Sequence, residues 1–268
     1  MKKQFKLGVI GGGFMAQAIL KGVISSNVIK SEQIIVADIS QTALQKLEYL
    51  RVNLTTDCVQ VAKNCEFLLF AVKPQNFPDV ANELSQIQIE KVISIMAGVK
   101  KQKIRTLLND EKIKVARAMP NLPCSVNKGM TAVDVSDFSN EDSEFIGSIF
   151  KNIGNLLFIS EEKLNAVTGI SGSGPAYVYM FIDGLIKAGI THGLTEEEAK
   201  ILAVSTVAGG AEMVFKSQDK TLDELISAVC SKGGTTIEAV NSFKNDGLYQ
   251  IIDTAVGACV KRAEELSK

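Results

Sequence analysis

The first residues with the types and spacing for chemistry form a glycine-rich turn, Ile10-Gly11-Gly12-Gly13-Phe14-Met15-Ala16, between an apolar run and an amphipathic stretch. In this spacing, Gly11 permits a tight turn, Gly13 lets a diphosphate approach the backbone, and Ala16 allows close packing of a helix on a strand. The helix N-terminus then offers free N–H groups and partial positive charge to the phosphates. The turn predicts a dinucleotide site, and an ordinary tight turn is the plainer alternative.

Asp38 is the second candidate cofactor residue, because it ends the next apolar run, about 20 residues beyond the turn. A carboxylate at this place accepts hydrogen bonds from the adenosine ribose and repels a 2′-phosphate, so by itself it favours NADH over NADPH. The alternative is an aspartate that only caps the helix after it.

Two further segments end apolar runs, and ligands of open α/β sheets bind at the carboxyl ends of strands. In Ala71-Val72-Lys73-Pro74, we expect Lys73 to face the cofactor, with an ordinary solvated lysine as the alternative. In Met96-Ala97-Gly98, the small residues leave room for a flat ring against the backbone. Both segments are predicted to bind the cofactor.

A third motif, Ser231-Lys232-Gly233-Gly234-Thr235-Thr236, precedes a predicted helix in the second half. Paired glycines flanked by hydroxyls at a helix start form a nest of N–H groups suited to a substrate carboxylate. The alternative is that Ser231 or Thr235 is simply a helix cap. His192 is the only histidine and lies near a predicted helix end, so we expect it to offset the helix dipole rather than to transfer protons. No metal-ligand spacing is present.

The elements that position these residues follow from the hydrophobic pattern of residues 1–160. The apolar runs are Leu7–Ile10, Ile34–Ala37, Phe67–Val72, Val92–Met96 and Lys114–Ala118, with edge strands expected at Met130–Val135 and Leu156–Ile159. Helices are predicted at Met15–Ile24, Gln41–Leu50, Asp57–Asn64, Phe77–Leu84, Lys101–Leu108 and Glu141–Ile153. Continuous apolar strands indicate a sheet covered on both faces, so we predict a Rossmann-like doubly wound α/β domain.

Residues 161–268 show only helical periodicity and are predicted to form an all-α domain. The expected helices are Pro175–Ile190, Glu196–Phe215, Leu222–Ala228, Thr235–Asn245 and Leu248–Leu266. The first of these helices is apolar nearly all round, so it must be buried on more than one side. We infer a homodimer, with burial against the chain's own first domain as the alternative.

Composition excludes several classes of function. The 268 residues carry a net charge of −1 with interleaved signs, which argues against nucleic acid and anionic membranes as partners. The five cysteines contain no Cys-x-x-Cys pair, which is typical of free thiols in a reducing cytoplasm. Lys2 and Lys3 before an apolar stretch look like an export signal, but three consecutive glycines interrupt that stretch. No apolar stretch reaches the ~18 residues of a membrane span.

Together these motifs resemble pyrroline-5-carboxylate reductases over essentially the whole chain. The specific blocks are Ser171–Tyr177 and Ser231–Thr236 continued by Ile237-Glu238-Ala239. The resemblance implies hydride transfer from NADPH or NADH to the C=N carbon of 1-pyrroline-5-carboxylate, giving L-proline, on a Rossmann domain with a helical dimerisation domain. It further implies a homodimer, with a larger ring of dimers left open, whose active site lies between the cofactor and the helical domain of the dimer mate.

The resemblance also implies roles for single residues. The loop of Ser231, Gly233, Gly234 and Thr235 would hold the substrate carboxylate through N–H groups and a serine, and Thr236 would hydrogen-bond the ring nitrogen as the proposed proton donor. Two departures matter: Lys232 stands where the family commonly has proline, and Asp38 puts the NADPH preference of many members in doubt.

Two other functions remain open at this point. A non-catalytic dinucleotide-binding redox sensor would keep the first-half motifs but would not need the nest at Ser231–Thr236. A β-hydroxyacid dehydrogenase-like enzyme would share the two-domain plan. Such enzymes usually have a lysine at the start of a long second-domain helix, whereas this chain has no lysine there before Lys187.

Overall fold

The computed structural model describes residues 3–266 and divides them into two compact units. The first unit extends to Ser173 and takes up the end of the chain from Cys259 onward, and the second is Gly174–Ala258. The sequence predicts a domain boundary after residue 160. In the structure, the boundaries between the two compact units lie after Ser173 and within the last helix.

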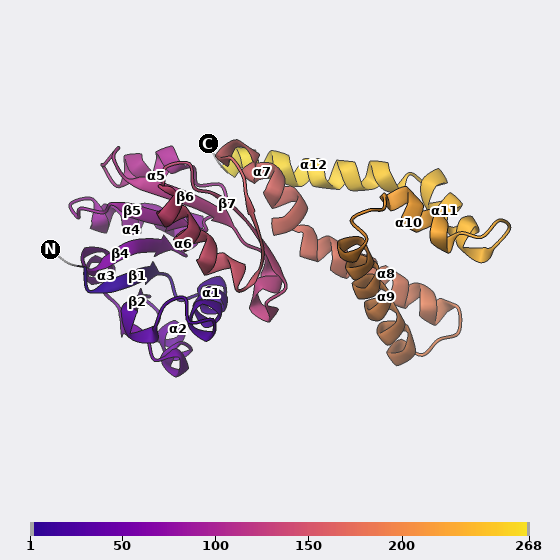
Figure 1. Cartoon of the computed structure of the whole chain (residues 1–268), viewed down its shortest axis with the longest axis horizontal. Coiled ribbons are helices and arrows are strands. Elements are labelled where there is room, and N and C mark those ends of the chain that lie inside the picture. Colours follow the sequence, from indigo (N-terminus) through magenta and orange to yellow (C-terminus); the bar gives the residue numbers. More distant parts are fainter. Residues whose placement is uncertain (1–2, 267–268) are drawn as a thin grey trace. The chain divides into compact units, whose positions relative to one another are not determined.

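The first unit holds an eight-stranded sheet with helices on both faces (Figure 1). Its strands are β1 (Phe5–Ile10), β2 (Ile34–Ala37), β3 (Asn53–Thr55), β4 (Cys65–Phe70), β5 (Lys91–Ser94), β6 (Lys114–Met119), β7 (Gly129–Asp134) and β8 (Gly154–Phe158). Its helices are α1 (Phe14–Ser25), α2 (Gln41–Gln45), α3 (Cys58–Asn64), α4 (Phe77–Leu84), α5 (Lys101–Leu107), α6 (Asn140–Lys151) and α7 (Leu164–Val167). The predicted α/β fold is confirmed.

The sheet places the ligand crevice at β1. The strand order is β3-β2-β1-β4-β5-β6-β7-β8, and β1 pairs in parallel with both β2 and β4. The chain therefore winds in opposite directions from β1, and the carboxyl ends of β1 and β4 form the crevice where such sheets bind ligands. Leu7 and Val9 face the core under α1 and α6, while Ile10 and Phe70 face the core under α3, α4 and α5.

The structure departs from the predicted elements at four places. β7 runs antiparallel to β6, because the connection from Met119 to Gly129 is too short for the crossover that a parallel strand needs. The predicted helix Gln41–Leu50 ends at Gln45 and gives way to a 3₁₀ turn at Glu48–Leu50. β3 has only three residues, and a π turn at Thr168–Gly172 follows α7; the hydrophobic pattern predicted neither.

The second unit consists of helices: α8 (Gly174–Thr191), α9 (Glu196–Lys216), α10 (Leu222–Val229), α11 (Thr235–Asn245) and α12 (Leu248–Leu266), the last of which ends in the first unit. Thr195 and Glu198 form a capping box at the start of α9. Within this unit only Ala199 and Ala203 are buried hydrophobic residues of the described chain. Large apolar side chains such as Met180 and Phe215 are exposed.

This exposure extends to α8, the helix that the sequence predicts to be buried on more than one side. No residue of α8 is buried in the single chain, although the helix is apolar nearly all round. Large apolar side chains exposed along several helices of one unit are typical of a protein–protein interface. Of the described helices, none has the length and apolarity to cross a membrane.

Candidate functional site

The glycine turn is wedged between the ends of β2 and β4. The N–H of Gly11 donates to the carbonyl of Ala37 at 2.8 Å, and the N–H of Ala71 donates to the carbonyl of Ile10 at 2.9 Å. Gly11 has φ +104°, and a Cβ built there would lie 2.7 Å from the Ala71 carbonyl. Only glycine combines this left-handed backbone with such a close approach.

The start of α1 is open to a ligand. Gly13 is the N-cap residue, no side chain caps the helix, and a Cβ added to Gly13 would meet nothing within 4 Å. The first-turn N–H groups of a helix have no intrahelical partner, and together with the helix dipole they favour an anion. These features fit the pyrophosphate of a dinucleotide, as the sequence predicted.

Asp38 is held against this turn by two backbone groups. Its Oδ2 accepts the N–H of Gly12 at 2.7 Å, and its Oδ1 accepts the N–H of Ser40 at 2.8 Å. The cap of α2 is Ser40, whose hydroxyl accepts the N–H of Ala43, so the alternative reading of Asp38 as a helix cap is wrong. Each carboxylate oxygen keeps capacity for a further bond, for example from a ribose hydroxyl.

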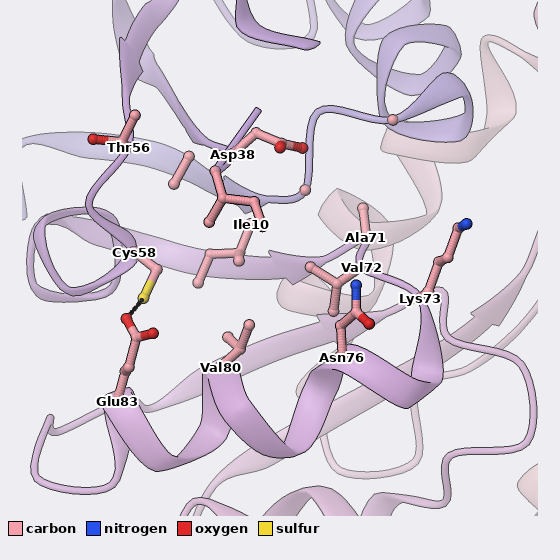
Figure 2. Close-up of a pocket in the computed structure, with 14 residues that line it drawn as sticks. Ile10, Asp38, Thr56, Cys58, Ala71, Val72, Lys73, Asn76, Val80 and Glu83 are labelled. Carbon is pink, nitrogen blue, oxygen red and sulfur yellow. Dashed lines mark hydrogen bonds between the residues drawn. The ribbon is translucent and has the colours of Figure 1, made fainter. Parts of the chain in front are cut away.

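A pocket of about 290 Å³ opens at the carboxyl ends of β1, β2 and β4 (Figure 2). Seven predicted cofactor residues line it: Ile10, Gly11, Gly13, Asp38, Ala71, Val72 and Lys73. The polar groups Asp38, Lys73 and Glu83 lie around apolar walls, an arrangement suited to a nucleotide. The structure therefore brings together the first three predicted segments at one edge of the sheet.

The remaining predicted cofactor residues do not line this pocket. They are Gly12, Phe14, Met15, Ala16, Pro74, Met96, Ala97 and Gly98. Ala16 is a buried residue of α1 and faces the core, in the role predicted for close helix–strand packing. The side chain of Met96 is in the core below the sheet, and Gly98, at φ +75°, would place a Cβ 3.2 Å from the Cβ of Leu266. Cofactor contacts at the Met96–Gly98 segment stay a prediction.

Sequence reasoning missed one wall of the pocket. Thr56 and Cys58 follow β3, whose shortness hid the strand end that positions them. Asn76, Val80 and Glu83 also line the pocket and are spaced by four and three residues. Residues at this spacing lie on one face of a helix. The spacing is therefore the feature of the sequence from which this wall of the pocket could have been predicted.

The candidate substrate loop is in the second unit and leads into α11. Gly234 is the N-cap residue, and no side chain caps the helix, so neither Ser231 nor Thr235 takes the capping role of the alternative reading. Gly233 has φ +71°, and the N–H of Gly234 donates to the carbonyl of Ser231 at 3.0 Å. The turn leaves the first N–H groups of α11 without intrahelical partners, as an anion nest requires.

Two other features of the sequence have structural roles. His192 directly follows α8, and its backbone N–H donates to the carbonyl of Ala188 at 3.0 Å. The side-chain amide of Asn121 donates to the carbonyl of Ser171 at 3.2 Å, and its oxygen accepts the N–H of Met130 at 2.8 Å. Asn121 therefore ties the loop after β6 to the π turn at Thr168–Gly172, in which the Ser171–Tyr177 block begins.

Comparisons with known proteins agree over the whole chain. A family model described as "Pyrroline-5-carboxylate reductase dimerisation" matches residues 161–266, and one described as "NADP oxidoreductase coenzyme F420-dependent" matches residues 6–98. A pyrroline-5-carboxylate reductase of Synechocystis is 38% identical over 268 residues and covers 98% of each chain.

Two solved structures are also similar. A pyrroline-5-carboxylate reductase from Coxiella burnetii has a TM-score of 0.90 at 33% identity and covers 99% of both chains. The pyrroline carboxylate reductase of Plasmodium falciparum, determined with NADP bound, has a TM-score of 0.86 at 30% identity and covers 100% of both chains. Similarity at this level over the full length shows descent from one family with one fold, and the chain belongs to the pyrroline-5-carboxylate reductase family.

Proposed function

We propose that this protein reduces 1-pyrroline-5-carboxylate to L-proline, with NADH or NADPH as the hydride donor. The observation that carries the proposal is the presence, in one chain, of two helix starts whose N-cap is a glycine with no side-chain cap, at Gly13 and at Gly234. The first suits a cofactor pyrophosphate, and the second suits the carboxylate of a small anionic substrate.

The cofactor would be held by the glycine turn and by the pocket beside it. The N–H groups at the start of α1 bind the pyrophosphate, Asp38 accepts the hydroxyls of the adenosine ribose, and Val72 and Ile10 contact the base side of the nucleotide. When bound, the cofactor supplies a hydride to the substrate. Because Asp38 is a fixed carboxylate, a free 2′-hydroxyl fits this pocket better than a 2′-phosphate.

The loop Ser231–Thr236 would position the substrate. Its N–H groups and the Ser231 hydroxyl bind the carboxylate, which places the C=N bond of the ring next to the start of α11. The imine nitrogen is protonated before hydride transfer. We assign the hydrogen bond to that nitrogen, and the delivery of this proton, to the Thr236 hydroxyl, which regains a proton from solvent water. When hydride forms the new C–H bond, the π electron pair of the C=N bond becomes the lone pair of the amine nitrogen, which keeps its proton. Positioning supplies much of the rate, because a protonated imine already accepts hydride well.

The active unit is proposed to be a homodimer assembled through the second unit. The exposed apolar side chains of α8 and α9 require a cover, and the matching family model is a dimerisation model. A ring built from such dimers is also compatible with this proposal. All five cysteines are free thiols, which supports the predicted cytoplasmic location.

The direct test is oxidation of NADH and of NADPH by the purified protein with 1-pyrroline-5-carboxylate, followed by absorbance of the nicotinamide and by detection of proline. Formation of proline in step with cofactor oxidation supports the proposal. Binding of either cofactor without any oxidation would overturn it in favour of the redox-sensor alternative.

A further inference from the structure

One end of the pocket carries a polar pair that the proposed chemistry does not use. Cys58, at the start of α3, and Glu83, near the end of α4, line the pocket on the side away from Lys73 (Figure 2). The Cys58 thiol donates to Glu83 Oε2 at 3.0 Å. The two residues are 25 positions apart in the sequence, so the fold alone makes this contact.

The pair presents a hydrogen-bond acceptor to the pocket. Burial, together with the hydrogen bond to Glu83, raises the pKa of the Cys58 thiol to about 12, so the thiol keeps its proton and stays a donor. That bond orients the carboxylate through one oxygen. Among the described residues the other oxygen, Oε1, has no hydrogen-bond partner, and it lies on the side of Val80 within the pocket (Figure 2).

The position of the Cys58–Glu83 pair suits contact with the adenine of a dinucleotide. A cofactor whose pyrophosphate binds at the glycine turn and whose adenosine ribose binds at Asp38 must place its adenine further along the same pocket. Apolar side chains of Ile10, Val72 and Val80 line that stretch and can contact the faces of a flat base. The Cys58–Glu83 pair lies at its end, where the edge of the base arrives.

We propose that Glu83, oriented by Cys58, recognises the adenine of the cofactor by accepting a hydrogen bond from its exocyclic amino group. A carboxylate has only acceptors, whereas that amino group has only donors, so the two match. A base with a carbonyl oxygen at the same position would face the carboxylate with a second acceptor. This inference rests on the proposed cofactor binding and names the residue that selects the base.

The test compares two cofactors that differ at this group and at the adjacent ring nitrogen, N1, which is an acceptor in adenine and carries a proton in hypoxanthine. NADH and reduced nicotinamide hypoxanthine dinucleotide, in which a carbonyl oxygen replaces the amino group, are titrated into the full-length protein, and the Kd is read from nicotinamide fluorescence. We expect the wild type to bind NADH about tenfold more tightly, as for a hydrogen bond to a charged group. If NADPH binds more tightly than NADH, the corresponding phosphorylated pair is used.

Substitutions then assign the effect. Glu83→Gln places an amide, with both donors and an acceptor, at the same position, so the preference should fall to within about twofold. Cys58→Ser keeps a donor to Glu83 and should retain most of the preference, whereas Cys58→Ala should weaken it. Asp79→Asn is the matched control, because Asp79 is an exposed carboxylate on the same helix that does not line the pocket.

The outcomes separate this inference from the proposed function. Equal binding of the two cofactors by the wild type, or an unchanged preference in Glu83→Gln, would overturn the role of Glu83 even where proline is still formed. Failure to bind either cofactor would contradict the proposed function itself. Loss of preference in Glu83→Gln, with Asp79→Asn unchanged, would establish the assignment.

Discussion

The Asp38 carboxylate is bonded to the glycine turn itself, since its Oδ2 accepts the N–H of Gly12 at 2.7 Å. The residue that would select the ribose is thereby fixed to the segment that would bind the pyrophosphate. A second bond, from the N–H of Ser40 to Oδ1, prevents the carboxylate from turning away. The position of the Asp38 carboxylate is therefore a fixed feature of the pocket.

Removal of this charge should change the cofactor preference. Asp38→Asn keeps an oxygen that can accept the Gly12 N–H but loses the negative charge that repels a 2′-phosphate. We expect the ratio of kcat/KM for NADPH to that for NADH to rise about fivefold to tenfold. Steady-state oxidation of each cofactor measures the ratio. Glu48→Gln, which removes a charge from an exposed turn outside the pocket, should leave it unchanged.

Two glycines of the turn should respond differently to alanine. In Gly11→Ala, the new Cβ would lie 2.7 Å from the Ala71 carbonyl on a backbone with φ +104°, so we expect the free energy of unfolding to fall by about 2 kcal/mol or more. In Gly13→Ala, the Cβ meets no protein atom within 4 Å, so stability should stay near that of the wild type.

Although it should leave stability nearly unchanged, Gly13→Ala should weaken cofactor binding. The methyl group in Gly13→Ala would occupy the open space before α1 that we assign to the pyrophosphate, so the Kd for NADH should rise at least severalfold while the Tm changes little. Thermal unfolding and fluorescence titration measure the two quantities. A Gly13→Ala protein with wild-type affinity would place the pyrophosphate elsewhere.

Thr236 should affect the chemical step rather than cofactor binding. Thr236→Ala removes the hydroxyl proposed to donate to the ring nitrogen, and we expect turnover to fall about 100-fold, within the usual range for a general acid. The Kd for NADH should stay within about twofold, because the glycine turn is unaltered. Thr236→Ser keeps the hydroxyl and should recover most of the turnover. Wild-type turnover in Thr236→Ala would remove this residue from the mechanism.

The assembly should follow from the exposed apolar surface of the second unit. Light scattering at micromolar concentration is expected to give the mass of a dimer or of a multiple of dimers. Met180→Asp places a charge on the exposed face of α8 and should shift the protein toward the monomer on dilution. A wild-type monomer across the whole concentration series would contradict the proposed homodimer.

Local sequence determined most elements of the fold. Strands such as Ile34–Ala37 and helices such as Phe77–Leu84 were predicted at the bounds that the structure has, because an apolar run or a helical period is a property of adjacent residues. The glycine turn was equally readable, since the spacing of Gly11, Gly13 and Ala16 is a local requirement. The direction of β7 was not, because strand pairing depends on partners distant in sequence.

The same division applies to the candidate site. The sequence by itself determined which segments carry the chemistry: the glycine turn, Asp38, Lys73 and the loop at Ser231–Thr236. Only the tertiary structure decided that Asp38 bonds the turn rather than capping α2, and that Cys58 bonds Glu83. Both contacts join residues that lie far apart along the chain, and only folding of the sheet and its helices brings such residues within hydrogen-bond distance.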